Sequence, residues 1–236
     1  MKTEFVSLVS HQLRTPLSSM RWNLEMLYGG DVGKLSIKQK EVVKNTKEAN
    51  ERMIKLISTL LNISRIESGR LIVEPEEVDL VAYFGDLAKR CQSNVKGQEL
   101  KLSMPKGMYK VVVDPMLLRQ ITNNFVNNAS KYSPEDKPIE IGVVDMGEKY
   151  AISVTDHGIG IPLAEQRKIF GKFFRASNVS KQETDGTGMG LYISSMLVKL
   201  LGGTIEFESK ENVGTTFRII LPKKGVSAIA GEVKLV

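Results

Sequence analysis

Side chains that carry nucleophilic or metal chemistry are scarce in this chain of 236 residues, which holds one cysteine, Cys91, and two histidines, His11 and His157. These three residues are too few for a structural zinc site built from cysteine and histidine. A single cysteine also forms no internal disulfide and is typical of a reducing compartment. Chemistry at an imidazole must therefore use His11 or His157, where the neutral ring can act as a nucleophile.

His11 lies on the polar face of an amphipathic helix predicted over residues 3–28. It is two residues away from both Val9 and Leu13 of the apolar stripe, so it lies roughly 160–200° from each around the helix axis. Pro16 follows five residues later. Because proline has no N–H and its ring clashes with the preceding turn, we expect the helix to bend there. The imidazole of His11 is thus predicted to face solvent.

The second half of the chain carries polar residues that suit a bound phosphate. Asn124 and Asn128 are four residues apart, one helical turn, and Lys131 follows three residues later on the same face. Lysine offers a point charge to phosphate. Glycines at alternate positions over 186–190 directly precede a predicted helix, and free N–H groups at such a helix start can bind phosphate.

Two long helices, over 3–28 and 36–67, are predicted to precede a mixed region of strands and helices. The second begins with a capping box, Ser36 with Gln39, and stops at Gly69. Its apolar stripe recurs in steps of four and three, typical of a coiled-coil seam, at Val42, Thr46, Ala49, Met53, Leu56, Leu60 and Ile63. Two helices cannot bury so wide a stripe alone, which favours a four-helix bundle made by a homodimer. Docking of the hairpin on the C-terminal domain is the alternative.

After Gly69 strands and helices mix without a regular βαβ repeat, so the predicted fold class is α+β: the helical hairpin, then an α/β sandwich with a mixed, largely antiparallel sheet. The domains are 1–70, 71–222 and a loosely held tail, 223–236. Strands are predicted at 71–75, 110–113, 139–144, 150–155, 204–209 and 215–221. Helices are predicted from Asp79 to about Val95, from Asp114-Pro115 onward, and over 191–201.

The net charge of +6 lies mostly in the hairpin, because residues 1–70 hold 7 Lys and 5 Arg against 6 Glu and 1 Asp. Such a segment could bind nucleic acid, an anionic membrane or an acidic protein. Its acids are interspersed with its bases, which favours a solvated helix face over nucleic-acid binding. No stretch approaches the ~20 apolar residues that span a bilayer. We expect a cytoplasmic location, with no membrane contact by this segment, which could be part of a larger sensor.

The segment Phe5–Leu17, FVSLVSHQLRTPL, resembles the phosphoacceptor box of sensor histidine kinases. The order and spacing of its His, Leu, Arg, Thr, Pro and Leu match the family. This resemblance implies that His11 accepts a phosphoryl group and that Thr15 can orient a water that dephosphorylates the partner. Gln12 departs from the family, which usually has Glu or Asp there, and leaves the pattern for phosphatase activity incomplete.

Four segments of the second half resemble further motifs of the same family, so that the resemblance runs from His11 to Pro222. They are the N box Asn124–Ser133, the first glycine box Asp156–Pro162, the phenylalanine box Phe170–Arg175 and the second glycine box Gly186–Leu191. The fold is shared with ATPases such as DNA gyrase, in which a glutamate that activates water matches Asn124. Asn124 cannot act as that base, so the pocket is expected to bind ATP but to hydrolyse it poorly.

The resemblance also implies a role for each residue of the nucleotide pocket. Asn128 would hold Mg²⁺ through its amide oxygen, Asp156 would accept a hydrogen bond from the adenine amino group, and residues 175–185 would form a lid. His157 stands at a position that the family leaves variable, which favours a passive role. The expected ATP-binding residues are Asn124, Asn128, Lys131, Tyr132, Asp156, Gly158, Gly160, Phe173, Arg175, Gly186, Thr187, Gly188, Gly190 and Leu191.

The function implied is that of a protein-histidine kinase that uses Mg-ATP. Autophosphorylation on His11 would precede phosphotransfer to an aspartate of a response-regulator receiver domain, and the basic hairpin would receive that acidic partner. Two alternatives stay open: a nucleotide-binding scaffold that transfers no phosphate, and a phosphatase of the response regulator.

Overall fold

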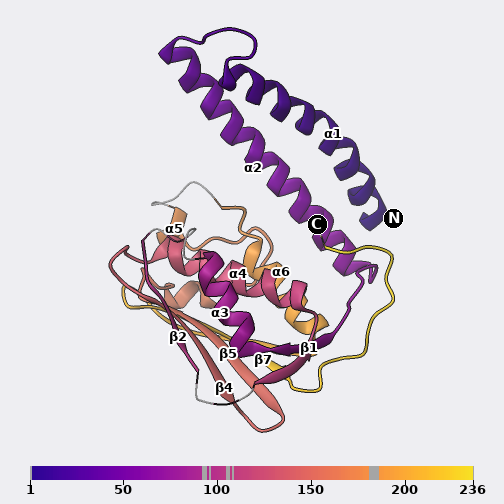
Figure 1. Ribbon diagram of the computed structural model, residues 1–236, viewed down its shortest axis with the longest axis vertical. Helices are drawn as coiled ribbons and strands as arrows, with labels where there is room; N and C mark the ends of the chain where they lie inside the picture. Colours follow the sequence, from indigo (N-terminus) through magenta and orange to yellow (C-terminus); the bar gives the residue numbers. More distant parts are fainter. Residues whose placement is uncertain are drawn as a thin grey trace. The chain divides into compact units, whose positions relative to one another are not determined.

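The computed structural model describes residues 2–91, 95, 97–104, 107, 109–180 and 186–235. The chain divides into two compact units, Met1–Ile72 with Ala230–Val236, and Val73–Ile229. Figure 1 draws the two helices of the first unit in indigo and violet, and the strands and helices of the second in magenta to yellow.

The first unit is a helical hairpin of α1 (Lys2–Gly29) and α2 (Ile37–Glu67). The predicted capping box is confirmed: the amide of Gln39 donates to Ser36 Oγ at 3.4 Å, and the amide of Ser36 donates to Gln39 Oε1 at 2.9 Å. Helix α1 runs through Pro16 as one element. The sequence thus predicts both helices to within one residue at each end.

The predicted apolar stripes are exposed at several positions in the single chain. Val42 and Met53 of α2 are 64% and 50% exposed, and Leu13 and Met20 of α1 are 43% and 47% exposed. A different set faces the interior of the hairpin, namely Leu17, Asn50, Ile57 and Leu61. These exposed positions leave apolar surface open to another partner, as a coiled-coil seam requires, whereas Ile63 at the end of the stripe is buried.

The second unit contains a five-stranded sheet in the order β2-β4-β5-β7-β6, in which β2 runs parallel to β4 and all other pairs are antiparallel. The predicted α+β class with a mixed, largely antiparallel sheet is confirmed. Its strands are β2 (Leu100–Ser103), β4 (Ile139–Asp145), β5 (Lys149–Asp156), β6 (Thr204–Lys210) and β7 (Gly214–Pro222). A two-stranded sheet pairs β1 (Glu76–Asp79) with β3 (Lys110–Val113).

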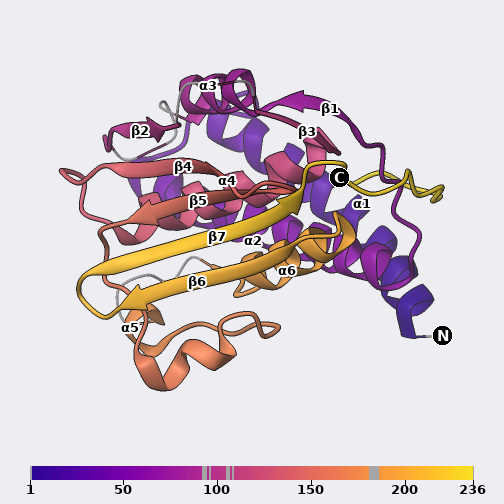
Figure 2. The same ribbon diagram turned by 90° about the horizontal axis from the view of Figure 1, so that it is seen from below.

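One face of the five-stranded sheet is covered by helices, as Figures 1 and 2 show. These are α3 (Leu80–Cys91), α4 (Pro115–Tyr132) and α6 (Gly190–Leu200); a 3-10 helix η1 (Leu163–Lys168) and a short α5 (Ser177–Ser180) lie between β5 and α6 in the chain. Period-two alternation on β4 and β7 points Ile141 and Phe217 into this core. The ring of Phe217 stacks on Phe125 of α4 at 5.2 Å, which ties helix to sheet.

Two features of the chain after Gly69 were predicted incorrectly. The predicted strand at 71–75 is reduced to isolated bridges from Leu71 to Val233 and from Val73 to Ile229. The same bridges show that the end of the chain is not a loosely held tail, since the amides of Ile72 and Val73 donate to its carbonyls. Helix α3 is described as far as Cys91, and residues 92–94, which precede its predicted end near Val95, lie outside the described residues.

Candidate functional site

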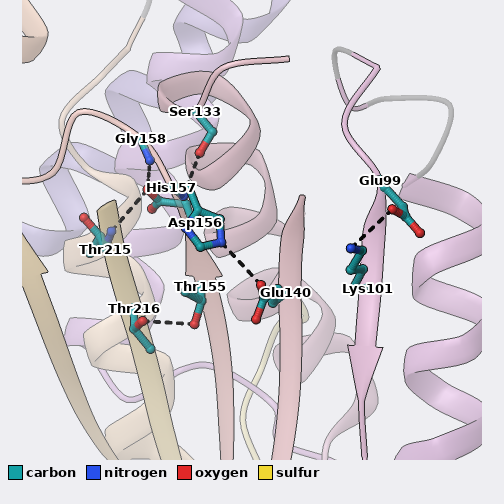
Figure 3. Close-up of polar contacts among 10 residues, drawn as sticks. All are labelled: Glu99, Lys101, Ser133, Glu140, Thr155, Asp156, His157, Gly158, Thr215 and Thr216. Atoms are coloured by element: carbon teal, nitrogen blue, oxygen red, sulfur yellow. Dashed lines mark hydrogen bonds and ion pairs between the residues drawn. The ribbon is translucent and has the colours of Figure 1, made fainter. Parts of the chain in front are cut away.

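Asp156, the last residue of β5, is a buried carboxylate held by backbone amides. Its Oδ1 accepts hydrogen bonds from the amides of Gly158 at 2.9 Å and Thr215 at 3.2 Å, as Figure 3 shows. Burial raises the pKa of the Asp156 carboxyl, and the two amides oppose that rise. Both bonds end on Oδ1, so Oδ2 is the oxygen left to accept a hydrogen bond from a ligand.

Two glycines of the first glycine box let backbone segments approach each other closely. A Cβ at Gly158 would overlap the carbonyl oxygen of Tyr132, and a Cβ at Gly160 would overlap that of Lys210. Gly160 also has a φ of 61°, which favours glycine. The glycines thus bring the end of α4 and the end of β6 against Asp156, and leave no room there for side chains.

A cavity of about 400 Å³ lies between the end of α4 and the first glycine box. It is lined by Lys131, Tyr132, Ser133, Pro134, His157, Gly158, Ile159 and Asn212. Burial raises the pKa of Tyr132, so its hydroxyl stays neutral and its ring offers a flat apolar face. The cavity therefore combines an aromatic surface with the only lysine of the N box.

His157 also lines this cavity, and both its amide and its ring contact neighbouring residues of the fold. Its amide donates to Ser133 Oγ at 3.1 Å, and its Nε2 lies 3.3 Å from Glu140 Oε1 on β4 (Figure 3). The imidazole thus contacts a side chain of the sheet. Its expected passive role stays a prediction.

Two cationic side chains meet at the second glycine box. A Cβ at Gly186 would lie 3.5 Å from Lys131 Nζ and 3.7 Å from Arg175 Cζ, and Arg175 Nη1 donates to the carbonyl of Gly186 at 3.4 Å. Gly190 begins α6, whose first amides have no intrahelical acceptor. Positive charge and the amides of a helix start therefore gather where an anionic phosphate chain would be stabilised.

Other expected pocket residues surround this glycine segment. Asn124 donates from Nδ2 to Ser194 Oγ at 2.9 Å, and a Cβ at Gly190 would overlap Asn124 Oδ1. Gly188, with φ 66°, packs against the backbone of Phe173, which itself has φ 60°. Residues of the N box, the phenylalanine box and the second glycine box thus lie in contact, although these motifs are far apart in the chain.

The remaining predicted pocket residues are placed less tightly. Asn128 and Leu191 are half-buried on α4 and α6, and Thr187 Oγ1 accepts from the amide of Met189 at 3.3 Å. Phe173 is 58% exposed. Part of the predicted lid, residues 181–185, lies outside the described residues.

Sequence reasoning missed Thr215 and Ser194, which hold Asp156 and Asn124 by hydrogen bonds. Thr215 is the cross-strand partner of Asp156 between β5 and β7. No local signal in the sequence gives that register. Ser194 follows Gly190 by one helical turn, so its position facing α4 could have been read from the helical period.

In the hairpin, His11 belongs to α1, and Gln12 and Thr15 are exposed on the same helix. The side chain of His11 lies outside the described part of the structure. Its predicted solvent-facing orientation therefore stays a prediction.

We expect Gly158→Ala to weaken ATP binding and to destabilise the second unit by about 1–3 kcal/mol, because the added methyl overlaps the Tyr132 carbonyl. Gly85→Ala is the matched control, since nothing lies within 4 Å of a Cβ on this α3 glycine. Nucleotide titration and urea unfolding measure the two effects. Equal behaviour of the two variants would contradict the close approach.

Comparison with known proteins agrees with this geometry. Residues 1–69 match the family model of the His Kinase A (phospho-acceptor) domain, and residues 113–225 match that of the histidine kinase-, DNA gyrase B- and HSP90-like ATPase. The chain is 34% identical to the sensor protein kinase WalK of Staphylococcus saprophyticus over 225 residues, covering 94% of this chain and 36% of the relative. A WalK of Staphylococcus aureus is also 34% identical, over 94% of this chain and 54% of that protein. The chain thus spans about a third to a half of these relatives.

Solved structures show the same fold. Full-length ShkA in complex with AMPPNP matches with a TM-score of 0.79 at 24% identity, covering 95% of this chain and 47% of ShkA. The catalytic domain of histidine kinase ThkA matches with a TM-score of 0.56 at 28% identity, covering 64% of this chain and 97% of that domain. Among the residues that the structure describes, no helix has the length and apolar character to cross a membrane.

Proposed function

Since this chain belongs to the sensor histidine kinases of two-component systems, we propose that it phosphorylates itself on His11 with ATP and passes the phosphoryl group to an aspartate of a response-regulator receiver domain. The observation that carries the proposal is that the N box contacts both glycine boxes: it meets the phenylalanine box and the second glycine box at Gly186–Gly190, and it packs on Gly158 next to Asp156. One end offers a carboxylate and the other offers two cations.

The residues present fit ATP at both ends of the site. The adenine amino group would donate to Oδ2 of Asp156, and Tyr132 would offer its ring to the base. The phosphates would lie at the start of α6, near Lys131 and Arg175. A bound Mg²⁺ would neutralise phosphate charge, and Asn128 on α4 would hold it through its amide oxygen, a hard ligand. Catalysis then rests mainly on positioning and charge neutralisation.

Transfer requires a neutral imidazole at His11. The unprotonated ring nitrogen gives its lone pair to the γ-phosphorus as the bond from that phosphorus to the bridging oxygen breaks, and ADP leaves with that oxygen. The other ring nitrogen keeps its proton and needs an acceptor as positive charge develops. Gln12, exposed beside His11 on α1, can supply an amide oxygen but no charge.

We also propose a homodimer, joined through the exposed stripe of the hairpin. Leu13, Met20, Val42 and Met53 leave apolar surface open on both helices, and a second hairpin would bury it in a four-helix bundle. The basic charge of residues 1–70 would then face the acidic receiver domain around His11.

The experiment that tests the proposal is single-turnover labelling with γ-labelled ATP. Acid-labile, base-stable label on the chain, followed by its transfer to a receiver domain, is the expected result. A scaffold would bind ATP without acquiring label. A phosphatase would remove phosphate from a phosphorylated receiver domain faster than the chain labels itself.

We expect Gln12→Glu to raise the rate of His11 phosphorylation by about tenfold, because a carboxylate stabilises a developing imidazolium by about 1–2 kcal/mol more than an amide does. Asn23→Asp adds the same charge to an exposed position of α1 twelve residues from His11, and should leave the rate unchanged. A rate for Gln12→Glu at or below that of the wild type would contradict the role given to this side chain.

A further inference from the structure

Asn50 of α2 is a polar residue in the interior of the hairpin. It is 5% exposed, and its Nδ2 donates to the main-chain carbonyl oxygen of Leu17 in α1 at 3.1 Å. Leu17 is itself 2% exposed. A side-chain bond to the backbone of a facing helix is directional, whereas the apolar contacts around it tolerate sliding and rotation.

The accepting residue, Leu17, directly follows Pro16, and the turn of α1 that ends at Pro16 lacks one backbone hydrogen bond. Proline gives no N–H to the carbonyl four residues before it, and its ring crowds that turn. His11 lies five residues before Pro16, on the other side of the weak turn. Asn50 therefore holds α1 on the side of the proline away from His11, at the point about which the first turns of the helix can move.

Two buried polar atoms near this bond have no hydrogen-bond partner in the described part of the chain: Asn50 Oδ1 and Arg14 Nη2. Arg14 lies one turn before Leu17 on the same face of α1. Each orphaned atom costs desolvation free energy that an apolar side chain would avoid. Asn50 thus makes the hairpin less stable than leucine would, which is typical of a buried asparagine that sets helix register.

We propose that Asn50 is a positioning residue for the phosphorylation of His11. It fixes the axial and rotational register of α1 against α2 just past Pro16, and so fixes the direction in which His11 is presented. This inference rests on the proposed function, because it needs His11 to be the phosphoacceptor. Without the bond, α1 can adopt neighbouring registers on the same apolar surface.

The test compares Asn50→Leu with Asn45→Leu in the whole chain. Leucine keeps the branched shape and the number of side-chain heavy atoms of Asn50 but is somewhat larger and has no donor. Asn45 is an exposed asparagine of the same helix. For Asn50→Leu we expect the maximal rate of His11 labelling to fall about tenfold, since misplaced reacting groups lose that much rate. The ATP concentration for half-maximal rate and the melting temperature should not fall. Amide hydrogen exchange in residues 12–21 should rise.

Asn50→Ala also removes the donor but adds no bulk, so it should give the same loss of rate if the missing hydrogen bond, and not disturbed packing, is the cause. Asn45→Leu should match the wild type in every measurement. An unchanged rate, or unchanged hydrogen exchange in residues 12–21, would overturn the inference. A loss of rate that follows a loss of melting temperature in both Asn50 variants would also overturn it. Absence of label on the wild type would overturn the proposed function instead. Hydrogen exchange in residues 12–21 would then still show whether Asn50 fixes the register of α1 against α2.

Discussion

Replacing His11 with alanine will abolish labelling of this chain by γ-labelled ATP, leaving less than about 0.1% of the wild-type rate, because the variant has no nucleophile at the acceptor position. Nucleotide binding should be unchanged, since Asp156, Lys131 and Arg175 belong to the second unit. Acid-labile label, measured beside nucleotide affinity, separates loss of the acceptor from loss of the ATP site.

His157→Ala is the matched control, because it removes the other histidine of the chain. The His157 ring contacts Glu140 on β4, and its loss should leave labelling within about twofold, because an exposed ion pair contributes little free energy. Label that persists in His11→Ala but disappears in His157→Ala would reverse the assignment. Label that persists in both variants would show an acceptor of another residue type.

The elements predicted most accurately are those with strong local signals. Asp114 followed by Pro115 predicts the start of α4, where Asp114 Oδ1 accepts from the amides of Met116 and Leu117. Ser36 with Gln39 does the same for α2. In both cases the groups that fix the boundary are within three residues of each other, so no tertiary contact is needed to find it.

Elements that depend on distant partners were missed. Strand β2 is four residues long and exists by pairing with β4, nearly forty residues later. Its alternating Leu100 and Leu102 were a weak signal that its shortness hid. The bridges of Leu71 and Val73 to the end of the chain join residues about 160 positions apart. A single sequence does not encode such pairings in any local pattern.

The candidate site likewise contains residues that local patterns predict and residues whose placement depends on distant parts of the chain. The resemblance of the motifs predicted Asp156 and the glycines as site residues, because each motif is a short local pattern. The main-chain amide that donates to this carboxylate from β7 follows from strand register, which places Thr215 opposite Asp156. Likewise, the convergence of Lys131 and Arg175 on Gly186 follows from how α4 packs on α6.

Asp156→Asn will weaken ATP binding by about tenfold to a hundredfold while making the second unit more stable. The amide oxygen can still accept from Gly158 and Thr215, so the local fold should persist. The amide nitrogen then stands where Oδ2 was, and faces the adenine amino group donor to donor. Loss of a hydrogen bond to a charged acceptor is worth about 1.5–3 kcal/mol, which corresponds to the stated loss of affinity.

The gain in stability follows from the sign of the pKa shift. Burial raises the pKa of Asp156 in the folded chain above its ordinary 3.8, so folding disfavours the charged form. The stabilising contribution of the protonated acid is complete below the ordinary pKa and is lost as the pH rises through the raised one. At neutral pH the wild type therefore carries an unfavourable buried charge that asparagine removes. Urea unfolding at neutral pH should show a higher free energy of unfolding for the variant.

Asp145→Asn is the control of opposite sign, because its hydrogen bond to Lys223 lowers the pKa of Asp145. Removing that charge should not stabilise the chain. The sharper check uses inosine triphosphate, whose 6-oxo group can accept from the new amide where adenine offers a donor. We expect Asp156→Asn to prefer inosine triphosphate to ATP, and the wild type to prefer ATP. If the variant still prefers ATP, Asp156 does not contact the adenine amino group. A variant less stable than the wild type would instead show that the charged carboxylate holds the two amides better than burial penalises it.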